Sequence, residues 1–307
     1  MLEDKLAQDF AQHLRRRGRS DATVHAYSRD LAAFAVWFSA TNGETMTPER
    51  ITALDMRDYK GYLQATRNHA PATVNRKLAA LSVFFTWARD EGLTTGDPTG
   101  GIKMVRRART APRWLERSEQ RDLARELEIA VQTARTEAAR FRARRDQAMA
   151  WLMLGAGLRV GEVAGLKLAD LTLRERSGQV VVRAETAKGD KQRTAPLNAT
   201  VRKALVAWLE VHPGDGDPWL FLSQKGGPMS VQAIYRRLKG HARRAGLERI
   251  TPHNLRHSCA KNLADRGVSL DRVAAILGHE SLDTTALYTQ PSQADLAHEM
   301  DKIAWEE

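Results

Sequence analysis

The sequence predicts a mainly α-helical protein with a small antiparallel β-sheet, divided into two domains. Three observations support this fold class. Apolar residues recur with helical spacing from the start of the chain to about residue 91, and this periodicity is lost between residues 92 and 113. Apolar and polar residues alternate, as in strands, between residues 170 and 197, inside a second half that is otherwise helical in pattern. A chain of 307 residues is long enough for two domains that each have a core.

The charge distribution favours a polyanionic partner. The chain carries 48 Lys and Arg against 37 Asp and Glu, a net charge of +11 at pH 7, and its pI is near 10.0. The basic residues run in blocks: LRRRGR from Leu14, VRRART from Val105, RFRARR from Arg140 and YRRLKGHARR from Tyr235. A solvated helix face explains any one block, whereas four blocks favour a long anionic ligand such as nucleic acid.

Cysteine usage and the apolar pattern exclude several classes of protein. The single cysteine, Cys259, cannot form a disulfide within the chain or a cysteine-cluster metal site, and its place beside Leu255 predicts a core position. No run of about twenty apolar residues could span a membrane. The start, MLEDKLAQDF, lacks the basic-then-apolar order of a signal peptide. We therefore expect a cytoplasmic protein that does not associate with a membrane.

Residues 1–91 are expected to form a domain of four helices. Apolar stripes with helical spacing mark the first two: Leu6, Phe10 and Leu14, then Val24, Tyr27, Leu31, Phe34 and Phe38. A shorter helix is expected from Leu54 to Leu63, and Thr73 is expected to cap the last, TVNRKLAALSVFFTWARDEG. The early polar face of that last helix consists of Asn75, Arg76 and Lys77. These residues are candidates for DNA contact, although an ordinary solvent face explains them equally well.

Residues 92–113 are predicted to be an interdomain linker. Glycine and proline interrupt the helical pattern at Gly96, Pro98, Gly100, Gly101 and Pro112. The same stretch contains the basic residues Lys103, Arg106, Arg107 and Arg109. Because a basic crossing gains affinity for phosphates through counterion release, we expect this linker to lie along DNA.

The second domain, from residue 114, is expected to open with one or two long, charged helices that follow Ser118 and end at Gly155 and Gly157. A short helix, GLRVGEVAGL, comes next and places Arg159 and Glu162 on the same side. An arginine at a helix start behind a glycine is well placed to receive a phosphate. A surface ion pair with Glu162 is the alternative explanation.

The pattern then changes from helical to alternating. DLTLRERS, QVVVRAET and KQRTAPL predict three antiparallel strands, with turns at Ser177-Gly178 and at Lys188-Gly189-Asp190. A lysine in such a turn, here Lys188, is usually only solvated. It can also reach into a neighbouring groove as a mobile point charge.

Two further helices are expected before residue 251, from Thr200 to Val211 and from Ser230 onward. The second presents a polar, hydrogen-bonding edge and is our first candidate for a helix on or in a DNA groove. Its candidate contact residues are Tyr235, Arg236, Arg237, Lys239 and Arg243.

The stretch from Thr251 to Thr289 concentrates groups that could act on a phosphate. Pro252 favours a helix start, which places His253, Arg256 and His257 on one face. A second helix is expected from Ser269 to Gly278, with His279 at the loop corner behind it. A third, capped by Ser281, would carry Tyr288, and the stripe Leu296, Met300 and Ile303 predicts a terminal helix.

Taken together, GLRVGE, the lysine turn, HNLRH, LGH and the YT that follows resemble, in order and character, the tyrosine recombinase (phage integrase) family. The resemblance covers nearly the whole chain, and the combination is specific although each motif alone would be weak. It implies a core-binding domain over 1–91, the linker over 92–113, a catalytic domain over 114–290, and a C-terminal helix over 291–307 that is exchanged with a neighbouring subunit.

The resemblance also implies roles for individual residues. Tyr288 would attack a scissile phosphate to give a 3′-phosphotyrosyl link, and Arg159 and Arg256 would bind the non-bridging oxygens. Lys188 would be the acid for the departing 5′-oxygen, His253 an acid/base near the tyrosine, and His279 a donor to phosphate. Glu162 and His257 would support them. The partners implied are double-stranded DNA with paired half-sites and a homotetramer that works through a Holliday junction.

Physical chemistry agrees with this set of residues. Two fixed guanidiniums can stabilise the charge that grows on the phosphate oxygens, and nearby cations favour the phenolate of a phenol with a pKa of about 10. The chain has no compact group of Asp and Glu of the kind a two-metal nuclease uses, so we expect no metal and no other cofactor.

Three alternatives remain open. A type IB topoisomerase shares the chemistry, and a non-catalytic DNA-binding accessory factor could share the fold. Within the recombinases, the compact two-domain plan is similar both to Xer-type enzymes of chromosome or plasmid dimer resolution and to integrases of mobile elements. We favour a mobile element because the charged stretch from Glu119 to Arg145 and the tail DKIAWEE depart from the Xer pattern.

Overall fold

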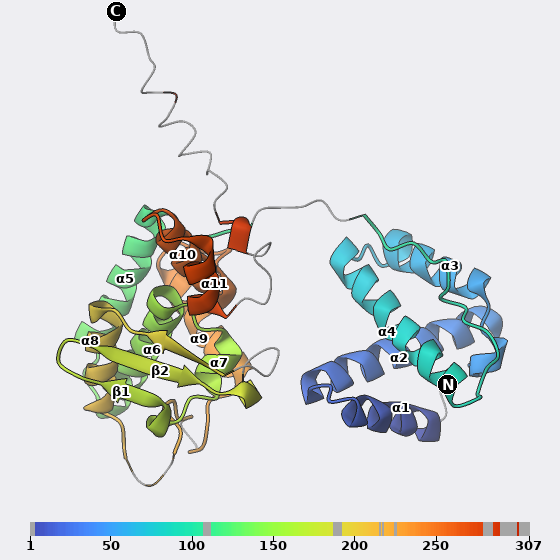
Figure 1. The fold of residues 1–307 in the computed structure, drawn as a ribbon, viewed down its shortest axis with the longest axis horizontal. Coiled ribbons are helices and arrows are strands. Elements are labelled where there is room, and N and C mark those ends of the chain that lie inside the picture. The colour runs from blue at the N-terminus through green and yellow to red at the C-terminus, as the bar shows by residue number, and fades with distance from the viewer. Residues whose placement is uncertain are drawn as a thin grey trace, which may run out of the picture. The chain divides into compact units, whose positions relative to one another are not determined.

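The computed structural model describes residues 4–106, 112–186, 192–214, 216, 218–223, 226–278, 285–288 and 300. The chain divides into two compact units, residues 1–110 and 111–307 (Figure 1). The expected fold class is confirmed, because the described residues are mainly helical and contain one three-stranded antiparallel sheet. None of the described helices is both long and apolar enough to cross a membrane.

The first unit is a helical bundle around an aromatic core. Its helices are α1 (Asp4–Arg16), α2 (Asp21–Asn42), α3 (Ala53–Gly61), which continues into a π-helical turn (Tyr62–Thr66), and α4 (Pro71–Asp90). Phe10, Phe34 and Phe84 are fully buried. The last helix begins at Pro71, with Ala70 as its N-cap, so the expected cap at Thr73 is wrong by one turn. Proline is favoured at a first helical position because its missing N–H would be unpaired there anyway.

The beginning of the predicted linker belongs to this unit. Ile102 and Val105 pack against its core. Lys60 donates to the carbonyl of Lys103 over 2.7 Å, and the amide of Asn75 exchanges two hydrogen bonds with the backbone of Val105, at 2.9 and 2.8 Å. The predicted linker is therefore attached to the first unit up to about residue 105, because backbone groups there are paired by α3 and α4. Residues 107–111, with Arg107 and Arg109, lie outside the described part.

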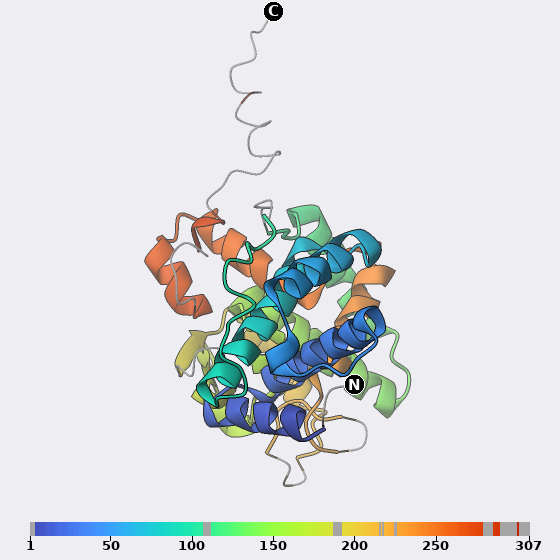
Figure 2. The ribbon, with the colours of Figure 1, turned by 90° about the vertical axis from the view of Figure 1, so that its right-hand side faces the viewer.

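The second unit is built around α6 (Glu137–Ala156), which packs against α5 (Arg117–Gln132), α8 (Ala199–Leu209), α9 (Val231–Arg244) and α10 (Pro252–Ala264). Its second half is buried. The charged stretch after Ser118 forms two helices because the side chain of Thr136 starts a new one by accepting from the Ala139 amide. The shorter helices are α7 (Val160–Ala164) and α11 (Leu270–Leu277), and α11 lies beside α10 (Figures 1 and 2).

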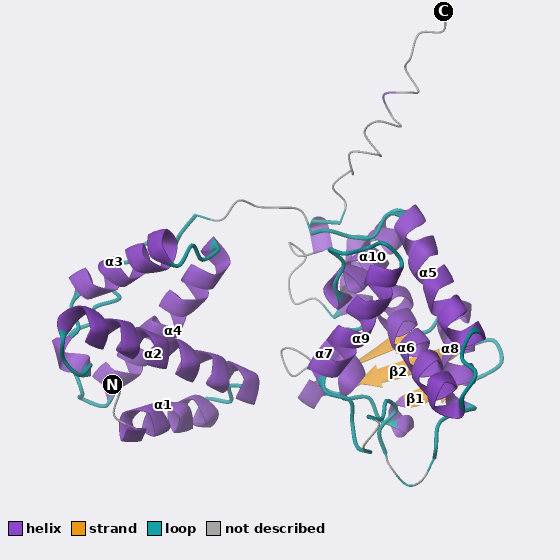
Figure 3. Ribbon diagram, turned by 180° about the vertical axis from the view of Figure 1, so that it is seen from behind, coloured by secondary structure: helices purple, strands orange, loops and turns teal. Residues whose placement is uncertain are grey.

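The sheet has the order β1-β2-β3, with β1 at Leu171–Leu173, β2 at Gly178–Val182 and β3 at Arg193–Pro196. All pairs are antiparallel, and Val180 lies opposite both Leu171 and Ala195. The inward residues Val180, Val182 and Ala195 are fully buried and join the core of α6, so the sheet covers one side of the helices (Figure 3). The β2–β3 connection includes Lys188, which lies outside the described residues.

Candidate active site

The turn between α6 and α7 places an arginine and a glutamate beside each other. Gly157 ends α6 in the left-handed conformation, with φ of 69°. A Cβ there would come within 2.3 Å of Leu277, so only glycine lets this turn lie against the end of α11. Arg159 is the N-cap of α7, and its backbone N–H donates to Glu162 over 2.7 Å. The expected pairing of Arg159 with Glu162 is confirmed, but the pair is largely buried rather than on the surface.

Glu162 is the fully buried centre of this cluster. One of its oxygens accepts from Arg159 Nη1 and Arg193 Nη1, each over 2.8 Å. The other accepts from the Arg159 amide and from Arg193 Nη2, and Arg256 lies 3.9 Å away. Burial acts to raise the pKa of Glu162, but the hydrogen bonds and charge of Arg193, with those of Arg159 and Arg256, outweigh it and lower the pKa. Glu162 is therefore an ionised acceptor with every lone pair used.

The same three arginines hold the end of α11. Arg193 Nε donates to the carbonyl of Ile276 at 3.3 Å, Arg256 Nη2 to Leu277 at 2.7 Å, and Arg159 Nη2 to Gly278 at 3.0 Å. The last carbonyls of a helix carry partial negative charge, so cations are stabilised there. Arg256 also donates to the carbonyl of Gly157 and is almost completely buried. Burial, followed by the charge of Arg159, lowers the pKa of Arg256 to about 10, which leaves it charged at neutral pH.

Helix α10 carries the other predicted residues. It begins at Pro252, as expected, and its first turn is closed by Thr251 and Asn254. Arg256 points into the cluster around Glu162, whereas His257 faces Tyr288. His253 is exposed on the first turn, and partial desolvation, with Arg256 and Arg159, lowers its pKa.

Tyr288 is packed into the protein with its hydroxyl on a histidine. Its side chain is 1% exposed and lies against Ala260, Val273 and Leu277. The hydroxyl and Nδ1 of His257 are 2.6 Å apart. Burial, then the charges of His253 and Arg256, lowers the pKa of His257 to about 4, and burial raises that of Tyr288 against the opposing effect of Arg256 and Arg159. Both groups are therefore neutral near pH 7, and the hydroxyl can donate to an unprotonated Nδ1.

The structure thus brings together five of the predicted residues, Arg159, Glu162, Arg256, His257 and Tyr288, with His253 at their edge. Lys188 and His279 lie outside the described residues. Sequence reasoning missed Arg193. A signal was available, because Arg193 shares a strand face with the buried Ala195, and an inward-pointing arginine needs a buried acceptor. Among the described residues, no group of three or more His, Cys, Asp or Glu could hold a metal ion.

The candidate DNA contacts at the start of α4 have partners inside the first unit. Asn75 binds the backbone of Val105. Lys77 donates to Asp30 over 3.0 Å, and Arg76 pairs with the same carboxylate. Asp30 is buried, so it needs these cations. The structure gives Asn75 and Lys77 a structural role, while Arg76 stays about half exposed.

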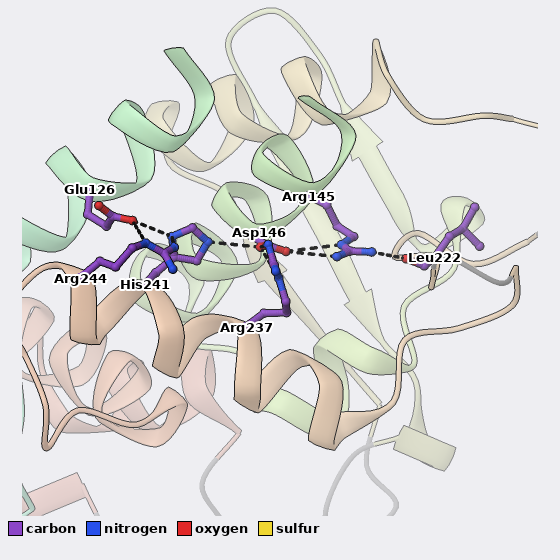
Figure 4. Close-up of polar contacts among 7 residues, drawn as sticks. All are labelled: Glu126, Arg145, Asp146, Leu222, Arg237, His241 and Arg244. Atoms are coloured by element: carbon purple, nitrogen blue, oxygen red, sulfur yellow. Dashed lines mark hydrogen bonds and ion pairs between the residues drawn. The ribbon is translucent and has the colours of Figure 1, made fainter. Parts of the chain in front are cut away.

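On α9 the predicted contacts divide between two faces. Arg236, Lys239 and Arg243 are exposed along one side, and Tyr235 is half-buried. Arg237 instead binds the fully buried Asp146, with Nε at 2.7 Å (Figure 4). That carboxylate belongs to a polar network of α5, α6 and α9, whose side chains are Glu126, Arg145, Asp146, Arg237, His241 and Arg244. In the linker, the side chains of Lys103 and Arg106 are exposed.

Comparisons with known proteins find matches over nearly the whole chain. The sequence matches the phage integrase family over residues 123–295 and the phage integrase N-terminal SAM-like domain over residues 6–95. It is 30% identical to the tyrosine recombinase XerC of Herpetosiphon aurantiacus, over 99% of this chain and 95% of that protein. It is 32% identical to the tyrosine recombinase XerD of Listeria monocytogenes, over 95% of each.

Solved structures share the fold. The XerH site-specific recombinase bound to its difH substrate, in a pre-cleavage complex, gives a TM-score of 0.70 at 22% identity, covering 98% of this chain and 85% of that one. The Tn1549 transposon integrase in complex with circular intermediate DNA gives a TM-score of 0.66 at 19% identity, covering 96% and 98%.

Proposed function

The chain belongs to the phage integrase family, the tyrosine recombinases, which break and rejoin DNA at specific sites, and we propose that it is the recombinase of a mobile element with Tyr288 as its nucleophile. The observation that carries the assignment of the site is the cluster of three guanidiniums around the single carboxylate of Glu162, beside a buried tyrosine whose hydroxyl binds a histidine. Such a cluster keeps positive charge where a phosphodiester would gain negative charge.

In the proposed reaction Tyr288 Oη attacks the scissile phosphorus. The new oxygen–phosphorus bond forms as the bond to the 5′-oxygen breaks, which leaves a 3′-phosphotyrosyl ester and a 5′-hydroxyl. Arg159 and Arg256 bind the non-bridging oxygens. Lys188 protonates the departing 5′-oxygen, His279 donates to the phosphate, and His253 moves protons near the tyrosine. The ester keeps the energy of the broken bond, so another 5′-hydroxyl can reverse the step without ATP.

The tyrosine needs to be released before it can react. At 1% exposure and with its hydroxyl on His257, Tyr288 cannot meet a phosphate where it lies. We propose that release accompanies assembly of a homotetramer on two paired DNA sites, which exchange strands through a Holliday junction. Each C-terminal segment, residues 291–307, would pass to a neighbouring subunit.

A groove of the second unit suits that segment. It has a volume of about 570 Å³, and Trp151, Leu154 and Leu263 line it together with Arg117, Arg121 and Arg266. Residues 291–307 offer a matching apolar stripe, Leu296, Met300 and Ile303, among five acidic residues, Asp295, Glu299, Asp301, Glu306 and Glu307. A chain ending at Gln290 should still bind DNA but lose coordinated strand exchange. Normal recombination by this truncated chain would contradict the exchange.

DNA contacts are proposed for the side chains that the fold leaves exposed. On α9 these are Arg236, Lys239 and Arg243, and in the segment after α4 they are Lys103 and Arg106. Arg76 can contribute from α4 because it is half exposed.

Xer-type dimer resolution is the second candidate, because the two relatives named above are XerC and XerD. The two roles differ in where the DNA is cut. A mobile-element recombinase cuts at the ends of the element that carries its gene, whereas dimer resolution uses a site elsewhere in the chromosome or plasmid. Cleavage is therefore best mapped on nicked suicide duplexes tiled across the genome that encodes the protein.

Tyr288→Phe tests the nucleophile. On the duplex with the strongest wild-type reaction, the wild type should form a covalent adduct with the 3′ end of the cut strand, in the presence of a chelator as in its absence. Tyr288→Phe should bind the same duplex with unchanged affinity and form no adduct. An adduct at the wild-type level would refute the assignment of Tyr288, and cleavage abolished by the chelator would indicate a metal-dependent nuclease instead.

A further inference from the structure

Arg193, on β3, binds both oxygens of Glu162 and the end of α11 but has no part in the proposed chemistry. We propose that it is a positioning residue, which holds Glu162 and the end of α11 so that Arg159 and Arg256 keep their orientation and their charge stays available to the phosphate. This inference rests on the proposed function.

The contacts of Arg193 distinguish it from a phosphate ligand. Each of its three nitrogens already donates a hydrogen bond: Nη1 and Nη2 to the two oxygens of Glu162, and Nε to the carbonyl of Ile276. A bidentate arginine–carboxylate pair has a fixed geometry, so Arg193 fixes the plane of the Glu162 carboxylate rather than following a ligand.

Charge gives Arg193 its first effect. Arg159, Arg193 and Arg256 surround the single carboxylate of Glu162, which leaves a net charge of +2 in a largely buried cluster. Without Arg193 the carboxylate would be balanced only by the two arginines that are expected to bind the phosphate. Because charges interact strongly when water is excluded, the buried carboxylate would then hold those two guanidiniums more tightly.

The second effect of Arg193 is on backbone close in sequence to two other proposed catalytic residues, His279 and Lys188. A Cβ on Gly278 would come within 2.8 Å of Arg193 Cδ, so the arginine packs directly across the C-cap of α11, and His279 is the next residue. Arg193 is also the first residue of β3 and pairs with Val182 at the end of β2. The connection between those two ends carries Lys188. The side chain of Arg193 therefore holds Glu162 and the end of α11, and its backbone lies at the end of the connection that carries Lys188.

The test compares two substrates. Arg193→Gln should lower the rate constant for adduct formation at saturating DNA by about 100-fold, the size of effect that a misplacement of catalytic groups by about 1 Å can have, and change DNA affinity by less than about threefold. On the same duplex with an uncharged methylphosphonate at the scissile position, the loss should shrink to less than about tenfold, because the reacting group then carries one negative charge fewer and depends less on the arginines. Arg193→Lys, which keeps the charge but cannot bridge both oxygens, should fall between.

Arg183→Gln is the matched control. Arg183 directly follows β2 and also pairs with a buried carboxylate, at 2.5 Å, but this carboxylate is Asp170 and not Glu162. It should react at close to the wild-type rate on both substrates. Thermal unfolding of each variant shows whether a loss of rate reflects loss of fold.

Three results would overturn the inference: an Arg193→Gln rate within about threefold of wild type, an equal loss on phosphodiester and methylphosphonate, or an equal loss in Arg193→Gln and Arg183→Gln. Failure of the proposed function is a separate outcome, because the wild-type protein would then form no adduct on any duplex of the tiled set.

Discussion

Asp146→Asn should destabilise the second unit more than any exposed charge substitution. Asp146 is fully buried and accepts from Arg237 at 2.7 Å and His241 at 3.2 Å, with Arg145 at 3.4 Å (Figure 4). Arg145 is buried as well, and its other bond is to the Leu222 carbonyl. Removing the carboxylate leaves a buried cation without its counterion, which costs about 3–5 kcal/mol. For a denaturant slope of about 2–3 kcal/mol/M, the urea midpoint should fall by roughly 1–2.5 M.

Arg113→Gln is the matched control for Asp146→Asn. Arg113 belongs to the same unit, is about half exposed and pairs with Glu119 over 2.6 Å. Such an exposed pair contributes about 0.5 kcal/mol. Urea unfolding followed by circular dichroism, on the full chain at pH 7, measures both variants. If Asp146→Asn lowers the midpoint no more than Arg113→Gln does, the buried network does not stabilise the unit as argued.

The pH dependence gives an independent check on the same residue. Burial acts to raise the pKa of Asp146, but the hydrogen bond to His241 and the charge of Arg237 outweigh it and lower the pKa. A lowered carboxylate pKa stabilises the fold above the unfolded value of about 3.9, and this stabilisation is lost as the pH falls through the folded value. The difference between wild type and Asp146→Asn should therefore be full at pH 7 and shrink below about pH 4. A difference independent of pH would point to packing rather than charge.

Two further predictions concern the candidate site. His257 has a pKa of about 4 when folded and about 6.5 when unfolded, so the folded state binds fewer protons and loses up to about 3 kcal/mol as the pH falls from 6.5 to 4. His257→Gln should flatten the unfolding free energy across that window, and an unchanged slope would contradict the lowered pKa. Gly278→Ala adds a Cβ 2.8 Å from Arg193 at φ of 68°, whereas Gly267→Ala meets open space at a similar φ of 73°. Each substitution should lower the free energy of unfolding by about 1–2 kcal/mol through backbone strain. Only Gly278→Ala should also slow adduct formation. Equal rates in the two variants would show that the contact between Gly278 and Arg193 does not matter for the reaction.

Local patterns predicted the parts of the fold that depend on neighbours in sequence. Helical spacing placed Arg256 and His257 on α10, and the cap signals of Pro252 and Gly278 fixed the ends of α10 and α11. The alternation after residue 170 predicted all three strands. Each of these features is decided within about one turn of helix or one strand, where propensity and periodicity act.

Pairings across the chain could not be read in the same way. The sequence made Lys77 a candidate for DNA contact, but in the structure it pairs with Asp30 on α2. Arg237 belongs to a basic block of the sequence and was also a candidate for DNA contact, but it donates a hydrogen bond to Asp146 of α6. In both cases a buried carboxylate far away in sequence decides the role of the cation, because a charge without a partner is costly to bury. The fold therefore separates the basic blocks into structural arginines and lysines and the exposed remainder that is free for DNA.

The cluster around Glu162 keeps a net positive charge although its arginines all have hydrogen-bond partners within the protein. The three guanidiniums donate to the carbonyls of Ile276, Leu277 and Gly278. Because a carbonyl is a dipole without net charge, these hydrogen bonds orient the guanidiniums without cancelling their charge. Glu162 alone neutralises one of the three positive charges. Because Arg193 binds both of its oxygens, most of this neutralisation falls on Arg193, which is less exposed than Arg159. Two positive charges are left for a phosphodiester, which carries one negative charge and gains more on its oxygens as it reacts. Orientation by dipoles and neutralisation by a single buried carboxylate together keep the guanidiniums oriented and leave the cluster positively charged.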